Sequence, residues 1–235
     1  MSNVGYRIVR NQSFFFNRSR CPSCRTTLVW YDLVPLVSWI LLRGRCRSCQ
    51  KPISWLYPFI EFLTTALFIL LILFQPIDYF AAYFIFFSAL IVSVRSDLET
   101  MLISRYVTLF LVPAGFLFSG LGLLPISLTQ SILGALVGYA LLWGTAQFFF
   151  LLTRKEGIGQ GDVELLALIG SFTGIAGAWL SLLIGSLAGS LIGLSYIAVA
   201  KVGRNAKIPF GPFLALGAFG YVFFREPLFK LLTGI

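Results

Sequence analysis

Residues 157–170 read GIGQGDVELLALIG, with three glycines before Asp162 and an apolar run after it. Aspartate is favoured at the start of a helix, where it caps the first backbone N–H groups and meets the positive end of the helix dipole. The apolar run continues to about residue 181 and approaches the roughly 20 residues that cross a bilayer. The stretch therefore predicts a membrane helix with a carboxylate in its first turn.

The composition places the whole chain in the membrane class. Of its 235 residues, 58% are hydrophobic and 11% are charged, against about 25% charged in soluble domains. The chain contains no histidine. This excludes Ser-His and Cys-His nucleophile pairs, histidine bases and histidine-ligated zinc, so catalysis must use carboxylates, Lys, Tyr, Ser or Cys.

The apolar segments predict an all-α polytopic membrane protein with about seven transmembrane helices. The division of residues 163–200 into a fifth and a sixth span rests only on Gly174, Gly177 and the turn-like sequence around them. The predicted spans are 56–75, 79–95, 105–124, 128–152, 163–181, 183–200 and 211–232.

The basic residues predict the orientation of these spans. Residues 1–55 hold nine of the 18 Lys and Arg residues against a single acid, Asp32. The loops predicted on the opposite side, near 76–78, 125–127 and 177–182, hold no basic residue. Positive charge accumulates on the cytoplasmic side of membrane proteins, so we expect a multi-pass protein with a cytoplasmic N-terminal segment. The same-side loops carry Arg95, Arg105, Arg154, Lys155, Lys201, Arg204 and Lys207.

The four cysteines form two C-x2-C pairs separated by 21 residues: Cys21 and Cys24, then Cys46 and Cys49. Two such pairs suit tetrahedral zinc with four thiolates and no open position, which makes the metal structural. The alternative is two disulfides, which cytoplasmic reduction disfavours. Arginines beside the cysteines offset the thiolate charge, and we expect no nucleic-acid partner. We therefore predict a zinc-binding segment over 1–55 and a membrane domain over 56–235.

Asp97 and Asp162 form the predicted catalytic pair. The topology places both at cytoplasmic helix ends, at the same membrane depth. Two carboxylates that share a site hold one proton between them, so one can activate water while the other protonates the leaving amine. Each aspartate alone could instead be a helix cap or an ordinary loop residue. Glu61, one turn inside the first span, is a further functional candidate because acids inside spans are costly.

The ordered motifs resemble those of the type IV prepilin peptidases, membrane aspartic proteases of the G-x-G-D class. The residues that carry the resemblance are SNVGYR, CPSC with CRSC, PISWLYPFIEFLT, SDLETMLIS, GQGDVELLALIG and KIPFGPFLALG. The resemblance implies cleavage of prepilin or pseudopilin precursors after a glycine, at the cytoplasmic face of the bacterial inner membrane. It also implies N-methylation of the new N-terminus with S-adenosylmethionine, with Glu61 as a candidate cofactor-binding residue, and membrane lipid as a partner.

Three features depart from the family pattern. The family has an apolar helix before the NVGYR segment, and this sequence begins inside that motif. Ser104 replaces the usual proline after Ile103, and Glu164 replaces the usual lysine two residues after Asp162. We expect the third carboxylate to impair cleavage. The other functions to weigh are a catalytically silent scaffold that docks a partner through the zinc segment, a transport protein, and a Ser-Lys peptidase with Lys155 as its base.

Overall fold

The structure is a computed structural model that describes residues 20–21, 23–155, 157–200 and 209–233. It divides into two compact units, residues 1–74 and 75–235, each of which is described by itself. The SNVGYR segment lies outside the described residues. So do the following basic residues used to predict the topology: Arg7, Arg10, Arg18, Lys201, Arg204 and Lys207.

The first unit joins a small cysteine-bearing module to one long helix. The module contains a 3-10 helix, η1 (Trp30–Leu33), and a short α-helix, α2 (Val37–Leu41), and the chain then forms α3 (Leu56–Phe74). Pro58 lies in the first turn of α3, where its missing N–H breaks no helical hydrogen bond. The 19 mostly apolar residues that follow the module therefore form one continuous helix.

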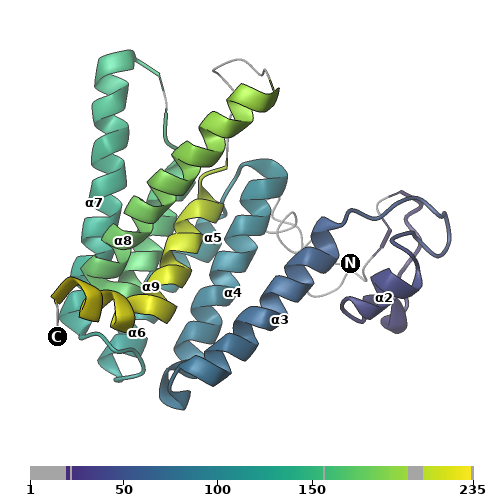
Figure 1. The fold of residues 1–235 in the computed structure, drawn as a ribbon, viewed down its shortest axis with the longest axis horizontal. Coiled ribbons are helices and arrows are strands. Elements are labelled where there is room, and N and C mark those ends of the chain that lie inside the picture. The colour runs from purple at the N-terminus through teal and green to yellow at the C-terminus, as the bar shows by residue number, and fades with distance from the viewer. Residues whose placement is uncertain (1–19, 22, 156, 201–208, 234–235) are drawn as a thin grey trace. The chain divides into compact units, whose positions relative to one another are not determined.

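The described residues of the second unit form helices joined by short turns and loops, as the sequence predicts (Figure 1). Ser127 begins α7 with a capping box, because it accepts from the backbone of Gln130 while the Gln130 side chain accepts from the Ser127 N–H. The elements in chain order are α4 (Ile77–Thr100), α5 (Arg105–Thr108), η2 (Leu109–Leu111), α6 (Val112–Gly120), α7 (Leu128–Thr153), α8 (Gln160–Ala200) and α9 (Gly211–Thr233).

Four helices in the described part of the chain are long and apolar enough to cross a membrane: α3, α4, α7 and α8. Two further apolar stretches, Arg105–Gly120 and Gly211–Arg225, are shorter. The predicted total of seven spans is therefore not confirmed and stays a prediction. The predicted boundary between 163–181 and 183–200 differs from the structure, because the chain breaks at Gly174, where φ is 73° and ψ is −173°.

Helix α8 reverses direction at this break. Its first half packs against α7 at Gly138 and Leu166, and Phe172 stacks on Phe86 of α4 with ring centroids 4.9 Å apart. Its second half packs antiparallel to α9, where Gly217 faces Ser181. Only glycine adopts this φ without strain, so Gly174 allows one apolar segment to form two helices that run in opposite directions.

Candidate active site

Asp97 lies in the last turn of α4 and faces the start of α9. Its side chain is buried, and Oδ2 accepts a hydrogen bond from the Gly211 backbone N–H at 2.9 Å. Helix α4 ends immediately afterwards, because Met101 adopts the left-handed conformation with φ of 55°. The contact joins residues that are 114 positions apart in sequence and holds the carboxylate against the first turn of α9.

Asp162 lies in the first turn of α8, at the helix end where the sequence places it. Its backbone N–H donates to the Gly159 carbonyl at 3.1 Å, which forms the tight turn that precedes the helix. The Oδ1 atom is buried and has no hydrogen-bond partner among the described residues. A buried, unpartnered carboxylate oxygen is costly, and at a helix start it marks a position at which a proton, a water or a substrate group would bind.

Ile103 connects the surroundings of the two aspartates. A Cβ atom at Gly161 would lie 2.8 Å from the Ile103 Cβ, and a Cβ at Gly211 would lie 3.3 Å from its Cδ1 and 2.9 Å from the Asp97 Oδ2. The two glycines therefore let the loop after α4 pack between the starts of α8 and α9. Ile103 therefore adjoins both the glycine before Asp162 and the glycine that binds Asp97, so the fold brings the predicted pair into one neighbourhood.

Two helices extend beyond the level of these aspartates. Gly138 of α7 lies against Leu166, one turn after Asp162, so about 11 residues of α7, or about 16 Å, continue past the level of Asp162. Gly189 of α8 lies against Phe210 and Phe213 beside the start of α9, and α8 continues from there by a similar length. Figure 1 shows both helices projecting past the start of α9. The aspartates are therefore recessed relative to the ends of α7 and α8.

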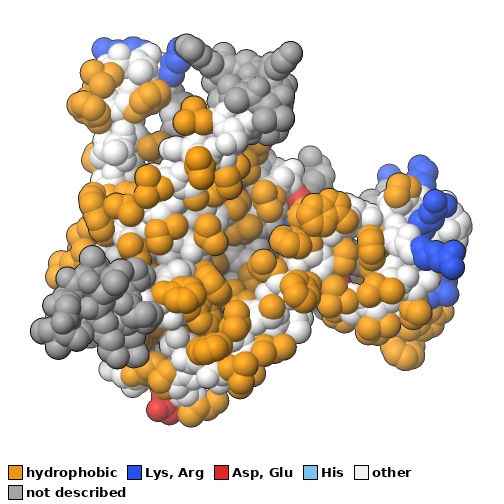
Figure 2. Space-filling view, viewed as in Figure 1, with side chains coloured by type: hydrophobic (Ala, Val, Ile, Leu, Met, Phe, Trp, Pro, Cys, Tyr) orange, Lys and Arg blue, Asp and Glu red, His pale blue; other side chains and the backbone are white. Residues whose placement is uncertain are grey.

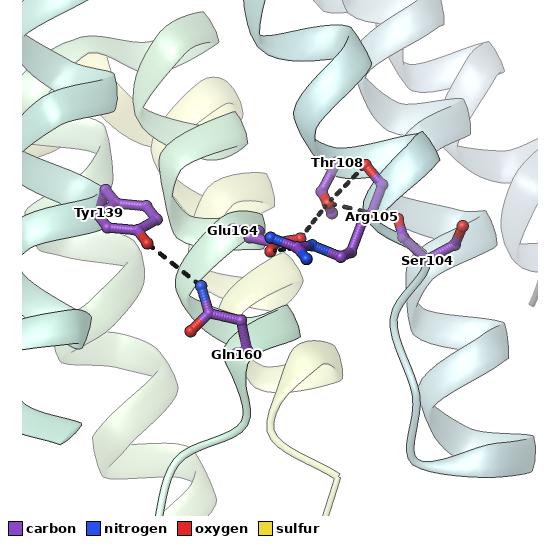
Figure 3. A network of polar contacts seen from close by, with 6 residues as sticks. All are labelled: Ser104, Arg105, Thr108, Tyr139, Gln160 and Glu164. Carbon is purple, nitrogen blue, oxygen red and sulfur yellow. Dashed lines mark hydrogen bonds and ion pairs between the residues drawn. The ribbon is translucent and has the colours of Figure 1, made fainter.

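Glu164 is fully buried one turn into α8, and Arg105 and Thr108 of α5 bind its carboxylate (Figure 3). Arg105 Nε donates to Oε1 at 2.8 Å, and Thr108 Oγ1 donates to Oε2 at 3.2 Å. Sequence reasoning assigned neither residue of α5 to the site. Their spacing of three positions on a short helix was the available signal, because it places both side chains on one face.

The cysteine module contains two turns of the same construction, a repeat that our sequence analysis missed. The sequence RCPSC at 20–24 is repeated as RCRSC at 45–49. In the first turn Arg25 N–H donates to the Cys21 carbonyl, and in the second Gln50 N–H donates to the Cys46 carbonyl, both at 2.9 Å. Arg25 and Gln50 have φ of 57° and 56°. The two turns therefore present their sulfur atoms in equivalent ways.

The four sulfurs converge on one point and can hold a metal. All four lie within 4.8 Å of one another, with Cys21 and Cys49 3.9 Å apart and Cys24 and Cys46 4.0 Å apart. Tetrahedral zinc with Zn–S bonds of about 2.3 Å requires sulfur separations of about 3.8 Å. The donor type, the number of donors and their spacing therefore fit zinc.

The thiols differ in how readily they ionise. Hydrogen bonds from the side chain and then the backbone of Thr26 lower the pKa of Cys24 to about 6. The backbone of Cys49 lowers the pKa of Cys46. A backbone hydrogen bond from Lys51 lowers the pKa of Cys49, but burial and the other three thiols outweigh it and raise that pKa to about 11. Crowded thiolates repel one another, and a divalent cation at their centre would offset this repulsion.

Comparison with known proteins identifies the family. Residues 84–194, which contain both aspartates, match the profile of the type IV leader peptidase family. Residues 1–75, which contain the four cysteines, match the bacterial peptidase A24 N-terminal domain. The chain belongs to the type IV leader peptidase family. This membership confirms the resemblance that we drew from the motifs and makes the chain a peptidase.

Curated members of this family with similar sequences are named prepilin leader peptidase/N-methyltransferase. The protein from Aeromonas hydrophila is 37% identical over 200 residues, which cover 85% of this chain and 69% of that protein. The protein from Burkholderia pseudomallei (strain 1026b) is 38% identical over 218 residues, covering 92% and 70%. The protein from Dickeya chrysanthemi is 36% identical over 206 residues, covering 87% and 72%. No solved structure matches the chain.

The two internal departures from the leader peptidase pattern have structural explanations. Ser104 has φ of −77° at the start of α5, a value that proline also adopts, so the bend does not require the proline ring. Glu164 does not leave an uncompensated charge beside Asp162, because its partner Arg105 neutralises it. The ion pair reduces the repulsion between Glu164 and Asp162, and the expectation that Glu164 impairs cleavage stays a prediction.

Glu61 has a backbone partner inside the first unit. Its Oε2 accepts the Leu36 N–H at 2.8 Å. This contact gives the carboxylate a structural role in joining the module to α3, and a role in binding a cofactor stays a prediction.

Proposed function

We propose that this leader peptidase is a membrane-embedded aspartic endopeptidase that cleaves prepilin or pseudopilin precursors after a glycine and then methylates the new N-terminus. Asp97 and Asp162 would be its catalytic pair. The observation that carries the proposal is the position of both carboxylates at adjoining helix ends, with an Asp162 oxygen buried and unpartnered. Substrate class and methylation are supported by the names of the curated relatives.

The pair would activate a water molecule bound between the two carboxyl groups and the scissile carbonyl. One ionised carboxylate takes a proton from the water, whose oxygen bonds to the carbonyl carbon. The other carboxyl group donates its proton to the carbonyl oxygen, which gives a tetrahedral intermediate with two hydroxyl groups. As the C–N bond breaks, the carboxyl group that took the water proton donates it to the leaving amine, and the other carboxylate takes a proton back from a hydroxyl group, which restores the pair. The two groups titrate as a unit, so neither has a fixed role.

The surroundings suit a peptide substrate. The Gly211 N–H holds Asp97 Oδ2 in place, which leaves its other oxygen for the reaction. Gly157, Gly159 and Gly161 precede Asp162 without side chains, so an extended backbone can come close to it. The apolar ends of α7 and α8 that extend past the aspartates would put cleavage beside a hydrophobic environment, which fits a precursor that is cut between a glycine and a hydrophobic residue.

The cysteine module would bind structural zinc and fold around it, since a segment this short has little apolar core. We place the module on the cytoplasmic side of the bacterial inner membrane, with 1–55 as the zinc-binding segment and 56–235 as the peptidase domain. S-adenosylmethionine would supply the methyl group. Replacing Glu61 with glutamine tests its assignment to that cofactor: the assignment requires methylation to fall while cleavage is retained.

The deciding experiment is cleavage of a pilin-like precursor with a Gly–Phe junction by the solubilised protein, with S-adenosylmethionine present and products identified by mass. We expect Asp97→Asn and Asp162→Asn each to lower the rate by at least about a hundredfold. Asp78→Asn is the matched control, because Asp78 is an exposed acid in the first turn of α4. Full activity in either dyad variant would remove that residue from the mechanism and leave a scaffold role open.

A further inference from the structure

The module carries an apolar surface that its own fold does not cover. The sequence of residues 28–42 is LVWYDLVPLVSWILL, with one charged residue in 15. Trp30 is 78% exposed and Leu41 is 76% exposed. Apolar stretches of 10–14 residues are too short to span a bilayer but are typical of buried core segments and of segments that lie in its interface. Because these side chains are exposed, the stretch is not a buried core segment of the first unit.

The one acid in this stretch does not interrupt its apolar surface. Asp32 is buried, and its Oδ1 accepts from Arg47 Nε at 3.0 Å and from Arg47 Nη2 at 2.9 Å. The guanidinium also lies 5.0 Å from the centre of the Tyr31 ring. The carboxylate is therefore neutralised inside the module, and the exposed Arg47 side chain, which lies over Tyr31, forms a basic edge beside the apolar residues.

The short helix α2 separates inward-facing from outward-facing side chains. Ser38 is buried, and the Trp39 indole lies over Gly44, at which a Cβ would come within 2.9 Å of the ring. Val37, Ile40 and Leu41 are exposed, and this spacing places them on one face of the helix. The outer face of α2 is thus apolar because its polar and packed residues all point inward.

The hydrogen bond between the Leu36 N–H and Glu61 fixes the position of this surface along the axis of α3. Glu61 is the sixth residue of α3, so the start of α2 lies level with a point about 7 Å beyond the beginning of that helix. Next to this contact the backbone makes a tight turn, in which Val37 N–H donates to the Pro35 carbonyl and Leu36 has φ of 60°. The turn leads directly into α2, so the start of α2 is held beside the first two turns of a candidate span.

The exposed apolar residues of the module continue onto α3. Phe59, Phe62 and Leu63, in the first two turns of α3, are also exposed. In Figure 2 the region of the α2 module shows blue side chains along one side and orange side chains along the other. The described basic residues of the module are Arg20, Arg25, Arg43, Arg45, Arg47 and Lys51, all exposed.

We propose that residues 29–41 form an interfacial membrane segment, which inserts the outer face of α2 and the Trp30 side chain into the lipid bilayer beside α3. This inference rests on the proposed crossing of the membrane by α3. The apolar face enters the boundary between headgroups and acyl chains, and the basic side remains in water. The cysteine module is then held on the bilayer, next to the face at which a membrane-anchored precursor arrives, instead of extending freely into solution.

Photochemical crosslinking to lipid tests this placement in the full chain reconstituted in bilayers. The photoreactive amino acid p-benzoylphenylalanine replaces one residue at a time, and phospholipid adducts are identified by mass. The positions are Ile40 on the apolar face, Ser48 on the exposed second cysteine turn, and Ile69 in the middle of α3. We expect lipid adducts at positions 40 and 69 and none at position 48. In addition, Leu41→Glu should reduce the adduct at position 40 several-fold, whereas Ser48→Glu should leave it unchanged.

Position 40 decides the proposal, and position 69 separately decides whether α3 lies in lipid. A crosslink from position 40 to protein, within this chain or to a second copy, would show that the apolar face is a protein interface and would overturn the proposal. Absence of any lipid adduct at position 40 while position 69 reacts would also overturn it. Absence of an adduct at position 69 would refute the membrane crossing of α3, whatever the result at position 40.

Discussion

The contact between α7 and α8 predicts that a single methyl group at residue 138 disrupts the site. A Cβ at Gly138 would lie 2.6 Å from the Leu166 carbonyl oxygen and 3.1 Å from its carbonyl carbon. Ordinary van der Waals contact begins at 3.4 Å, so Gly138→Ala forces the two helices apart by about 0.8 Å. The neighbouring atoms are backbone, and a rotamer change cannot relieve the overlap.

This displacement reaches Asp162, which lies one helical turn before Leu166. A shift of about 1 Å in a catalytic group can cost about a hundredfold in rate, and overpacking in a filled interior costs about 1–3 kcal/mol of stability. We expect Gly138→Ala to lower kcat for precursor cleavage by about tenfold to a hundredfold with little change in KM. We also expect a lower thermal unfolding temperature in detergent.

Gly144→Ala on the same helix is the matched control. Nothing lies within 4 Å of a Cβ at Gly144, and alanine raises helix propensity by about 1 kcal/mol relative to glycine. This variant should therefore retain activity and unfold at the same or a higher temperature. Equal kcat for the Gly138→Ala variant and the wild type would refute the conclusion that this close approach positions Asp162.

Three further predictions concern the stability of the helical unit and the metal site of the cysteine module. Arg105→Ala should cost about 1–3 kcal/mol in thermal unfolding, because it leaves the buried Glu164 carboxylate without its cation; adding Glu164→Gln should recover much of the loss, and an additive loss would contradict the pairing. A zinc chelator should raise the reactivity of the four cysteines toward a thiol reagent, because it removes the metal from the four-sulfur site. Cys46→Ser should raise the reactivity of the three cysteines that remain, because it removes one metal ligand. Unchanged reactivity would argue against a bound metal. Ser127→Ala should cost about 1 kcal/mol in thermal unfolding by removing the capping box of α7; an unchanged unfolding temperature would contradict the role of the cap.

Local patterns predicted the helices and the residues at their ends. The apolar runs predicted α3, α4 and α7 to within a few residues, because helix formation depends on neighbours along the chain and each run is long. The same local signals placed Asp97 in the last turn of α4 and Asp162 in the first turn of α8. The C-x2-C spacing predicted that the four cysteines would gather, because each tight turn brings two sulfurs together.

Contacts between distant residues decided the remaining features. The sequence indicated a division of the 163–200 segment near Gly174 and Gly177, but only packing against α7 on one side and α9 on the other makes Gly174 the point of reversal. Arg105 neutralises Glu164 across 59 positions of sequence. The periodicity of apolar residues along the chain does not predict such a distant pair.

The sequence by itself determined that this protein is a helical membrane-class chain with two aspartates at helix ends and four clustered cysteines. These properties follow from composition and from spacings of a few residues. Only the tertiary structure decided that Gly211 holds Asp97, that Ile103 packs between the two aspartate-bearing regions, and that Glu61 holds the start of α2 beside α3. Each of these requires two segments to pack side by side, and that packing depends on the shapes of whole helices.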